Sequence, residues 1–267
     1  MAVFEASGSP PPVLQLLADP HRWRLLVELS LSDRRVGELS DLLGRPQNLV
    51  SYHLGELRNA GLVAARKSSA DRRDTYYRAE LGRCRELLGA VGSTLHPALR
   101  SRPDLAMPEL PPRQRRAPLV LFLCTGNSAR SQMAEALLEH HSRGSVHARS
   151  AGSHPKALHP NAVRAMAERG IDISGGTAKH MAKFAHSRFD LVITLCDKVK
   201  EICPEFPGQP ATAHWSMPDP AAAGGTDEGS YPAFQRTAEE LEARIGLLIE
   251  RMAAQQQNRR MRGSRAH

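Results

Sequence analysis

One short segment joins a cysteine to an arginine at a spacing that suits oxyanion chemistry. Cys124 is followed by five residues and then by Arg130, and the segment lies between an apolar run at 119–123 and a helical pattern through Met133 and Leu137. A loop at a helix N-terminus presents free backbone amides and the positive end of the helix dipole to an anion. A guanidinium can bind a tetrahedral oxyanion with two hydrogen bonds, and the same positive field favours a thiolate. We therefore predict that Cys124 is a nucleophile toward an oxyanion held by this loop.

The other residues of the loop suit the same chemistry. Ser131 is placed to donate a hydrogen bond to the thiolate, and Asn127 tolerates a strained loop position. The residues expected to surround the oxyanion are Thr125, Gly126, Asn127, Ser128, Ala129 and Ser131. A structural cysteine beside an unrelated arginine is the alternative, and it leaves the flanking strand and helix and the Gly-Asn pair unexplained.

The loop, with the elements on either side, resembles the low-molecular-weight protein tyrosine phosphatase fold. Patterns at 145–151 and 191–195 predict two further strands, and the pattern at 161–169 predicts a helix. The resemblance implies an α/β fold with a four-stranded parallel sheet and helices on both faces. The active site then lies at the carboxyl ends of the strands.

Two more cysteines distinguish the two chemistries of this fold, phosphotyrosine hydrolysis and arsenate reduction. Cys196 ends the predicted strand at 191–195, at the sheet edge where Cys124 lies, and Cys203 follows seven residues later. With the His-Trp-Ser-Met-Pro-Asp-Pro segment at 214–220, this spacing resembles thioredoxin-coupled arsenate reductases. In a phosphatase the last two cysteines would be incidental.

The resemblance implies a relay of three thiols. Cys124 attacks arsenate while Asp219 protonates the departing oxygen. Cys196 then attacks Cys124 so that arsenite leaves, and Cys203 attacks Cys196. The implied substrate is arsenate, the reductant is thioredoxin or a glutaredoxin-like protein, and no cofactor is tightly bound. The alternatives are a tyrosine phosphatase, which needs only Cys124, Arg130 and Asp219, and a domain that only senses oxyanion or redox state.

The sequence departs from this family at two places beside the loop. Ala129 occupies a position that is often cysteine in the reductases, but that position has no required role in the relay. Some relatives bind potassium through an Asn, a Glu, a Ser and an Asp. Asn127, Glu135 and Ser150 match the first three, and the fourth position is Lys179 here. We expect the Lys179 ammonium group to replace the potassium ion.

The chain of 267 residues is long enough for two domains. Five prolines fall within residues 97–117 and exclude a regular helix or a central strand there. An Ala- and Gly-rich stretch at 221–230 predicts a surface loop, and the polar residues after Met252 predict a frayed tail. The predicted organisation is a first domain at 1–96, a linker at 97–117, a second domain at 118–252 and a basic tail at 253–267.

The first domain shows the element order of a winged helix-turn-helix. The predicted helices are at 13–18, 21–29, 36–43, 47–60 and 81–95, and the predicted strands of a hairpin are at 62–67 and 75–79. The segments at 17–22 and 49–63 resemble the ArsR family of bacterial repressors, and the resemblance covers residues 11–100. It implies a homodimer, joined by helices that flank the winged core, on a two-fold operator in double-stranded DNA.

The expected DNA contacts lie on the fourth helix and on the hairpin. Polar residues at the N-terminus of a recognition helix reach base edges in the major groove, and basic residues of a wing reach phosphates. The candidates are Gln47, Asn48, Ser51, Tyr52, His53, Arg58, Arg66, Lys67, Arg72 and Arg73. A winged helix used only for protein contacts is the alternative, and the basic hairpin argues against it.

The thiols of the first domain do not suit arsenite binding. Arsenic-sensing members of the family often carry a cysteine pair in the helix before the recognition helix, whereas residues 36–43 contain no cysteine. Cys84 stands alone on the last helix, and one thiolate cannot form a three-sulfur arsenite site. It is either a buried packing residue or a ligand or redox contact. We hypothesise that arsenite made by the second domain, or its thiol redox state, alters DNA binding by the first.

Composition bears on three further classes of protein: nucleic-acid-binding proteins, membrane or secreted proteins, and disulfide-rich proteins. The formal net charge is +8, and the basic excess lies at the two ends of the chain, which permits nucleic-acid binding. No uncharged apolar run approaches the roughly 18 residues of a membrane span, and no secretory signal is evident, so we expect a cytoplasmic protein. Four cysteines exclude a disulfide scaffold.

The histidines do not suggest a metal site, and two aromatic residues are expected in the hydrophobic core. The histidines examined for ligand spacing, which show none with a cysteine pair, are His140, His141, His180 and His186. We therefore expect no metal site. Trp215 and Phe234 are expected in the core. The combined prediction is an arsenate reductase fused to a DNA-binding repressor domain that regulates arsenic resistance.

Overall fold

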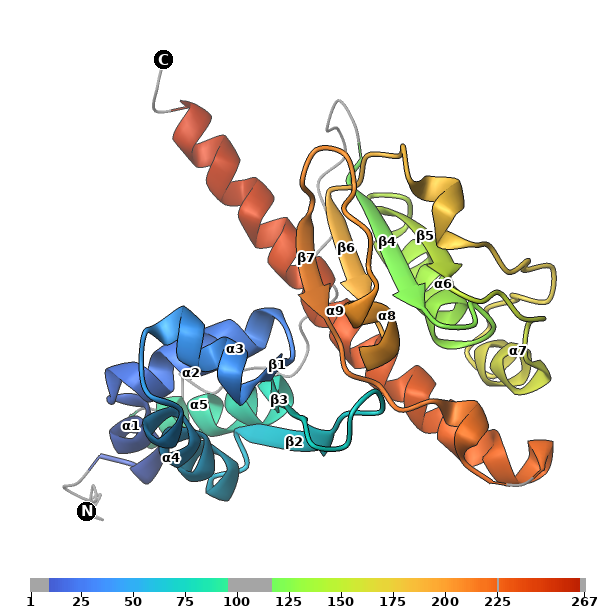
Figure 1. Ribbon diagram of the computed structural model, residues 1–267. Coiled ribbons are helices and arrows are strands. Elements are labelled where there is room, and N and C mark those ends of the chain that lie inside the picture. The colour runs from blue at the N-terminus through green and yellow to red at the C-terminus, as the bar shows by residue number, and fades with distance from the viewer. Residues whose placement is uncertain (1–9, 96–116, 225, 265–267) are drawn as a thin grey trace, which may run out of the picture. The chain divides into compact units, whose positions relative to one another are not determined.

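The computed structural model describes residues 10–95, 117–224 and 226–264. The chain divides into two compact units, Met1–Asp104 and Leu105–His267, whose elements are drawn in Figure 1. The proline-rich segment predicted as a linker at 97–117 lies outside the described residues except for its last residue. Among the described helices, none is both long enough and apolar enough to cross a membrane.

Within residues 10–95, the first unit combines five helices with a small antiparallel sheet. The helices are α1 Pro12–Leu17, α2 Pro20–Leu31, α3 Val36–Leu43, α4 Gln47–Asn59 and α5 Leu81–Leu95. The strands are β1 Arg34–Arg35, β2 Val63–Lys67 and β3 Thr75–Ala79, in the order β1-β3-β2. The predicted element order and hairpin are confirmed, while the two-residue strand β1 has no counterpart in the sequence analysis.

Local signals begin and end the helices of this unit. The Asp19 carboxylate accepts hydrogen bonds from the backbone N–H groups of His21 and Arg22, at 2.8 and 3.0 Å. Pro20 takes the first position of α2, where its missing N–H costs nothing. Gly44 ends α3 in the left-handed conformation, with a φ of 62°, which glycine adopts readily.

One apolar core joins the helices to the hairpin. Its buried members are Leu25, Leu26, Leu29, Leu39, Val50, Leu54, Leu57, Leu62 and Val63. On α4 they recur at the spacing of one helical face, and this face packs on α2 and α3. Cys84 is half-buried against the same core, and burial raises the pKa of its thiol. These observations favour the packing role for Cys84.

The second unit is an α/β fold built on a parallel sheet. Its strands are β4 Leu119–Cys124, β5 His147–Gly152, β6 Leu191–Thr194 and β7 Ala211–His214, in the order β5-β4-β6-β7. Every neighbouring pair is parallel, as predicted. Leu123 is paired with Ala151 on one side and with Thr194 on the other, so three strands end together at one edge. β7 is the fourth strand, which the sequence patterns did not locate.

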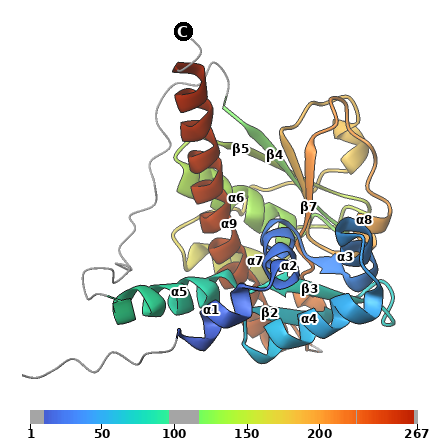
Figure 2. The same ribbon diagram turned by 90° about the vertical axis from the view of Figure 1, so that its left-hand side faces the viewer.

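Helices pack on this sheet and on one another. They are α6 Arg130–Ser142, α7 Pro160–Ala167, α8 Asp197–Glu201 and α9 Asp227–Ser264, with short 3-10 helices η2 Met181–Phe184 and η3 Pro220–Ala222. Helix α6 packs on β4 and β5 and also against α9 (Figure 2). Helix α9 packs in turn on α7 and η3.

Helix α9 corrects two expectations. The stretch at 221–230 is not one continuous loop, because η3 ends within it and α9 begins at Asp227. The helix also continues past Met252 to Ser264, where the polar composition predicts a frayed tail. Its buried side chains recur every three or four positions and anchor it to the core; they are Phe234, Ala238, Leu241, Ile245, Leu248, Ile249 and Ala253. Trp215 and Phe234 are buried in the core, as predicted.

Candidate functional site

The loop between β4 and α6 closes around the Cys124 thiol. The backbone N–H of Asn127 donates a hydrogen bond to the Cys124 sulfur at 3.2 Å, and the Ser131 hydroxyl lies 2.9 Å from the same atom. Cys124, Asn127 and Ser131 are all buried. Hydrogen-bond donors directed at a buried sulfur stabilise its negative form, which is the form that attacks an electrophile.

The loop directs its carbonyl groups outward. The carbonyl oxygens of Thr125, Gly126 and Ser128 accept hydrogen bonds from backbone N–H groups within residues 154–159, at 2.8 to 2.9 Å. A peptide carbonyl and the neighbouring N–H point in opposite directions, so this arrangement turns N–H groups toward the centre of the loop. A concavity of backbone N–H groups binds anions. The N-terminus of α6, which follows Ala129, adds the positive end of a helix dipole.

Asn127 holds the loop in a strained shape. Its φ is 45°, in the left-handed region, and its side-chain amide donates to the hydroxyls of Ser131 and Ser150, both at 2.9 Å. Its side-chain oxygen accepts from the backbone N–H of Lys179 at 2.7 Å. A non-glycine residue keeps this conformation only where its surroundings determine it. These three hydrogen bonds do so.

Gly152 is a site residue that the sequence analysis missed. It ends β5 beside the loop, and a Cβ atom there would lie 2.6 Å from the Thr125 carbonyl oxygen and 2.7 Å from the Asn127 backbone nitrogen. Both neighbours are backbone atoms, which cannot rotate away. Only glycine therefore allows the loop to approach β5 this closely. A glycine at the end of a strand is the sole sequence signal for this contact.

Arg130 joins the loop to the segment that follows β7. Its guanidinium is buried, donates to the Met217 carbonyl oxygen at 3.0 Å and lies 3.4 Å from the Asp219 carboxylate. The Asp219 side chain is 53% exposed and caps η3. Asp219 is therefore open to solvent on one side and beside the Arg130 guanidinium on the other.

Thr125 brings the second predicted thiol to the loop. Cys196 is buried at the N-cap position of α8, and its sulfur lies 3.2 Å from the Thr125 hydroxyl. Because Thr125 directly follows Cys124, the two buried cysteines belong to one group of side chains. The structure records Cys84, Cys124, Cys196 and Cys203 as free thiols.

A buried polar network supports the start of α8. Asp197, next to Cys196, is fully buried, accepts a hydrogen bond from the Ser216 hydroxyl at 2.6 Å and lies 3.1 Å from His214 Nε2. The other ring nitrogen of His214 lies 2.8 Å from the Thr194 hydroxyl. The network ties α8 to the ends of β6 and β7 and so positions Cys196. The sequence pattern alone gives no sign of this network, although the segment at 214–220 contains two of its members, His214 and Ser216.

Cys203 lies outside these contacts. It follows α8, is half-buried, and its thiol contacts the Pro204 carbonyl oxygen at 3.7 Å. Burial raises the pKa of this thiol, so it carries its proton at neutral pH. Cys203 and Cys196 are both free thiols, and a disulfide between them would require their sulfur atoms to come within about 2.05 Å of each other.

Lys179 places a positive charge beside the loop. Its ammonium nitrogen lies 3.1 Å from a carboxylate oxygen of Glu135, and the same oxygen accepts a hydrogen bond from the Ser150 hydroxyl. Asn127, Glu135 and Ser150 match the potassium ligands of some relatives, and Lys179 bonds to two of them, through its ammonium group to Glu135 and through its backbone N–H to Asn127. This set does not fit a potassium ion, because Lys179 supplies positive charge where the fourth ligand would supply negative charge.

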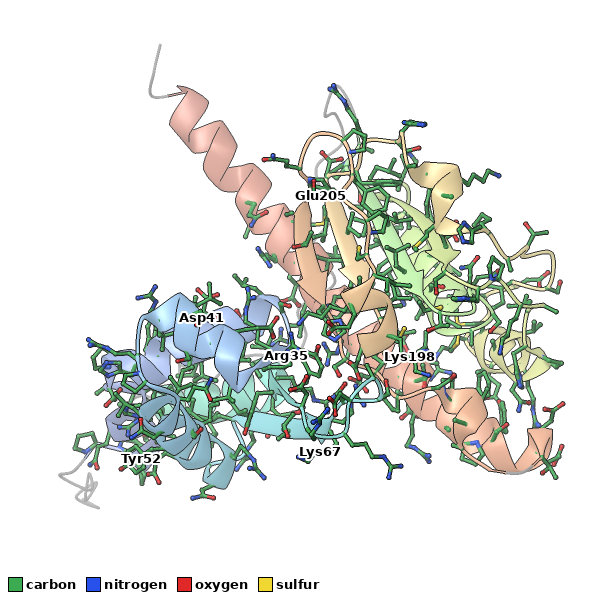
Figure 3. All side chains as sticks on the ribbon, viewed as in Figure 1. Arg35, Asp41, Tyr52, Lys67, Lys198 and Glu205 are labelled. Atoms are coloured by element: carbon green, nitrogen blue, oxygen red, sulfur yellow. The ribbon has the colours of Figure 1, made fainter. Side chains whose placement is uncertain are left out.

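Most of the predicted DNA contacts are exposed. On α4 these are Gln47, Asn48, Ser51, Tyr52 and Arg58, and on the hairpin they are Lys67, Arg72 and Arg73; Arg66 is half-buried. Tyr52 and Lys67 are labelled in Figure 3. Arg73 forms an exposed ion pair with Asp71 at 3.0 Å, which a phosphate group can replace at little cost.

His53 is the exception, and its prediction as a DNA contact is wrong. Its side chain is 8% exposed, stacks on His21 and faces Asp19. Position 53 comes three residues after Val50 and four before Leu57, so it lies within the apolar face of α4. The prediction rested on the polar side chain of His53, but its spacing from Val50 and Leu57 places it on the buried face of α4.

Comparisons with known proteins cover both units. A family model described as low molecular weight phosphotyrosine protein phosphatase matches residues 119–258. The chain belongs to this family. In the first unit, a model of the arsR family of bacterial regulatory proteins matches residues 19–65.

The relatives of the phosphatase-family unit include arsenate reductases. One from Bacillus licheniformis is 44% identical over 131 residues, which are 49% of this chain and 94% of the relative. Another from Halalkalibacterium halodurans is 41% identical over 132 residues, again 49% of this chain and 95% of the relative. A solved structure described as an arsenate reductase in the phosphate binding state has 33% identity and a TM-score of 0.45, over 50% of this chain and 98% of that chain.

The close approach of Gly152 generates a first prediction for the phosphatase-family unit. Gly152→Ala is expected to weaken phosphate binding about five- to 150-fold, because overpacking against the loop backbone that would bind the anion costs about 1 to 3 kcal/mol. Isothermal titration calorimetry with inorganic phosphate measures the change. Gly175→Ala is the control, since a Cβ atom there meets open space. Equal affinities for the two variants would contradict the proposed role of Gly152.

The ammonium group of Lys179 generates a second prediction. Wild-type protein is expected to bind phosphate equally well in KCl and in NaCl of the same ionic strength. Lys179→Met is expected to lower the free energy of unfolding by about 1 to 2 kcal/mol, because Glu135 loses its charged partner. Urea unfolding measures this loss, and Lys183→Met, which changes an exposed lysine on η2, serves as control. An increase in wild-type affinity with potassium that sodium does not reproduce would refute the replacement.

Proposed function

We propose that the second unit reduces arsenate to arsenite through Cys124, Cys196 and Cys203, and that the first unit binds operator DNA as a homodimer. One observation carries the enzymatic part: the buried Cys196 sulfur lies 3.2 Å from the Thr125 hydroxyl, at the loop that holds Cys124. Hydrolysis of a phosphate ester needs only one thiol at this place. The arsenate reductases among the relatives support the same reaction.

The first step uses the loop and its arginine. The Cys124 thiolate attacks arsenic and forms a sulfur–arsenic bond, while one arsenate oxygen leaves as water after taking a proton from Asp219. Arg130 and the inward N–H groups of the loop neutralise the charge of the remaining oxygens. Arsenic is still in the pentavalent state after this step.

The second step reduces arsenic. The Cys196 sulfur attacks the Cys124 sulfur, a disulfide bond forms, and the sulfur–arsenic bond breaks with its electron pair going to arsenic. Arsenic becomes trivalent and leaves as arsenite, and the two thiols have supplied two electrons. The Thr125 hydroxyl, 3.2 Å from the Cys196 sulfur, can stabilise the thiolate that makes this attack.

The third step regenerates the nucleophile. Cys203 loses its proton and attacks the Cys196 sulfur, so that Cys124 leaves as a thiolate and a Cys196–Cys203 disulfide remains. Because burial raises the pKa of Cys203, we expect this step to become faster as the pH rises above neutrality. An external dithiol protein of the thioredoxin or glutaredoxin type then reduces the disulfide, and no tightly bound cofactor is needed.

The surface of the first unit supports DNA binding and dimer formation. Exposed polar side chains of α4, including Tyr52, would enter the major groove, and Lys67 and Arg72 of the hairpin would contact phosphates. Leu14 on α1 and Leu88 on α5 are 38% and 46% exposed. Apolar side chains left exposed on both flanking helices suit an interface with a second copy of the chain.

Phosphatase activity is the second candidate for the second unit. Arg130 lies 3.4 Å from Asp219 beside the loop that holds Cys124, and these three residues would suffice to form a phosphocysteine and protonate the leaving oxygen. This reading gives Cys196 no role. Removing the Cys196 thiol therefore distinguishes arsenate reduction, which needs it, from phosphatase activity, which does not.

The relay predicts that all three thiol variants lose turnover and that Cys203→Ser alone among them completes a single reduction. In arsenate-dependent NADPH oxidation with thioredoxin and its reductase, Cys124→Ser, Cys196→Ser and Cys203→Ser are each expected to lose turnover on the order of 10³-fold or more. Without reductant, Cys203→Ser is expected to release one arsenite per chain and then stop with a Cys124–Cys196 disulfide. Cys84→Ser is the control and keeps wild-type turnover. If Cys196→Ser retains hydrolysis of an aryl phosphate while the wild type reduces no arsenate with either type of reductant, the phosphatase is the correct assignment.

The proposed DNA-binding surface predicts that some variants lose affinity for all DNA sequences and that others lose discrimination between sequences. On a duplex selected from a random-sequence pool, Lys67→Ala and Arg72→Ala are each expected to weaken binding to all sequences and to lower the salt dependence by about one ion. Tyr52→Ala is expected to reduce discrimination between selected and random duplexes. Arg188→Ala, which removes an exposed arginine of the second unit, is the matched control. Fluorescence anisotropy over a salt series measures all four, and unchanged salt slopes would exclude this face.

A further inference from the structure

Three side chains with metal-binding chemistry meet at the start of α2. Asp19 precedes the helix, His21 lies in its first turn, and His53 reaches the same place from α4. His21 Nδ1 lies 3.6 Å and His53 Nδ1 lies 4.0 Å from Asp19 Oδ1. One potential ligand atom from each of the three residues lies within 4.8 Å of the others. Sequence spacing gave no sign of this group, because 32 positions separate the two histidines.

The state of His53 points to a ligand. Its side chain is more than nine-tenths buried, and Nδ1 has no hydrogen-bond partner among the described residues. A buried nitrogen without a partner costs about 1 to 3 kcal/mol, so an unused nitrogen aimed at a carboxylate calls for an occupant. A ring nitrogen without a hydrogen-bond partner is the part of a neutral imidazole that binds a metal.

We propose that Asp19, His21 and His53 bind a divalent transition-metal ion of the Zn²⁺ type. Two imidazoles and one carboxylate form a donor set that suits zinc, with a water molecule as fourth ligand. Tetrahedral zinc with bonds of about 2.0 to 2.2 Å holds its ligand atoms about 3.3 to 3.5 Å apart. The present separations are somewhat wider, so binding must draw the ligands together and turn the stacked rings toward one centre.

The surroundings permit that adjustment. The His21 side chain is 30% exposed and lies at the end of a helix, so it has room to rotate toward the centre. The nearby Arg22 guanidinium donates to the Leu16 carbonyl oxygen at 2.6 Å and is directed toward α1. Both helix-capping hydrogen bonds of Asp19 end on Oδ1, the oxygen from which the two histidine distances are measured. Binding the ion through the second carboxylate oxygen therefore requires the carboxylate to turn that oxygen toward the histidines. An ion here would fasten the start of α2 to the helix that carries the proposed DNA contacts.

The test uses the full-length reduced protein after treatment with EDTA. Co²⁺ is the probe, because its visible spectrum separates nitrogen and oxygen ligands from thiolates, and the thiols of this chain also bind metals. Wild type is expected to show a ligand-field band from one Co²⁺ without a sulfur-to-cobalt charge-transfer band, and Zn²⁺ is expected to displace it. His21→Ala is expected to weaken Co²⁺ binding at least about tenfold, a loss that even an outer partner of a metal ligand causes.

Two further variants complete the experiment. His53→Gln removes the buried ligand and is expected to abolish the band, and circular dichroism checks that the variant folds. His21→Ala keeps the proposal testable if His53→Gln does not fold, because His21 is partly exposed and the Asp19 cap remains. His147→Ala, at a 53% exposed histidine of the second unit, is the control and is expected to bind as wild type does. A wild-type spectrum with only thiolate character, or an unchanged affinity in His21→Ala, would overturn the site.

Discussion

The second unit is organised around the conformation of a single loop residue. Asn127 adopts a left-handed backbone conformation, and its side chain bonds to Ser131, Ser150 and the backbone of Lys179. This conformation turns loop N–H groups toward the position of an anion and places one of them on the Cys124 sulfur. Since the contact with β5 leaves no room for a Cβ atom at Gly152, the strand that supports the loop must end in glycine.

Parallel strands then bring the other chemical groups to the same edge. Cys196 follows β6 and Asp219 follows β7. Because these strands are parallel to β4, both residues lie near the loop at the carboxyl end of β4. The buried Asp197–His214 pair keeps the first of these segments in place. Burying a carboxylate and an imidazole costs free energy unless each is the hydrogen-bonding partner of the other. The pair therefore fixes the position of Asp197, and with it that of the neighbouring Cys196. Cys203, in contrast, follows α8 and is half-buried against the core, with its thiol near the Pro204 carbonyl oxygen.

In the first unit, helix α4 contributes both to the hydrophobic core and to the exposed surface. Its apolar face packs on α2 and α3, and its opposite face presents polar side chains to solvent. His53 lies on the buried face, where it stacks on His21 near the Asp19 cap. The helix that would read DNA is thus connected to the start of α2 through polar groups as well as through the core.

The sequence alone determined the two fold classes and most of the element order, and it selected the three cysteines that we propose for the relay, because each depends on spacing along the chain. Helical periodicity, the Cys-x5-Arg loop and the basic hairpin are all local patterns. Only the tertiary structure decided the role of Gly152, the network of Asp197 with His214, the buried position of His53 and the full extent of α9. These features depend on which distant segments meet, and the free energy of burying a side chain comes from its neighbours in space.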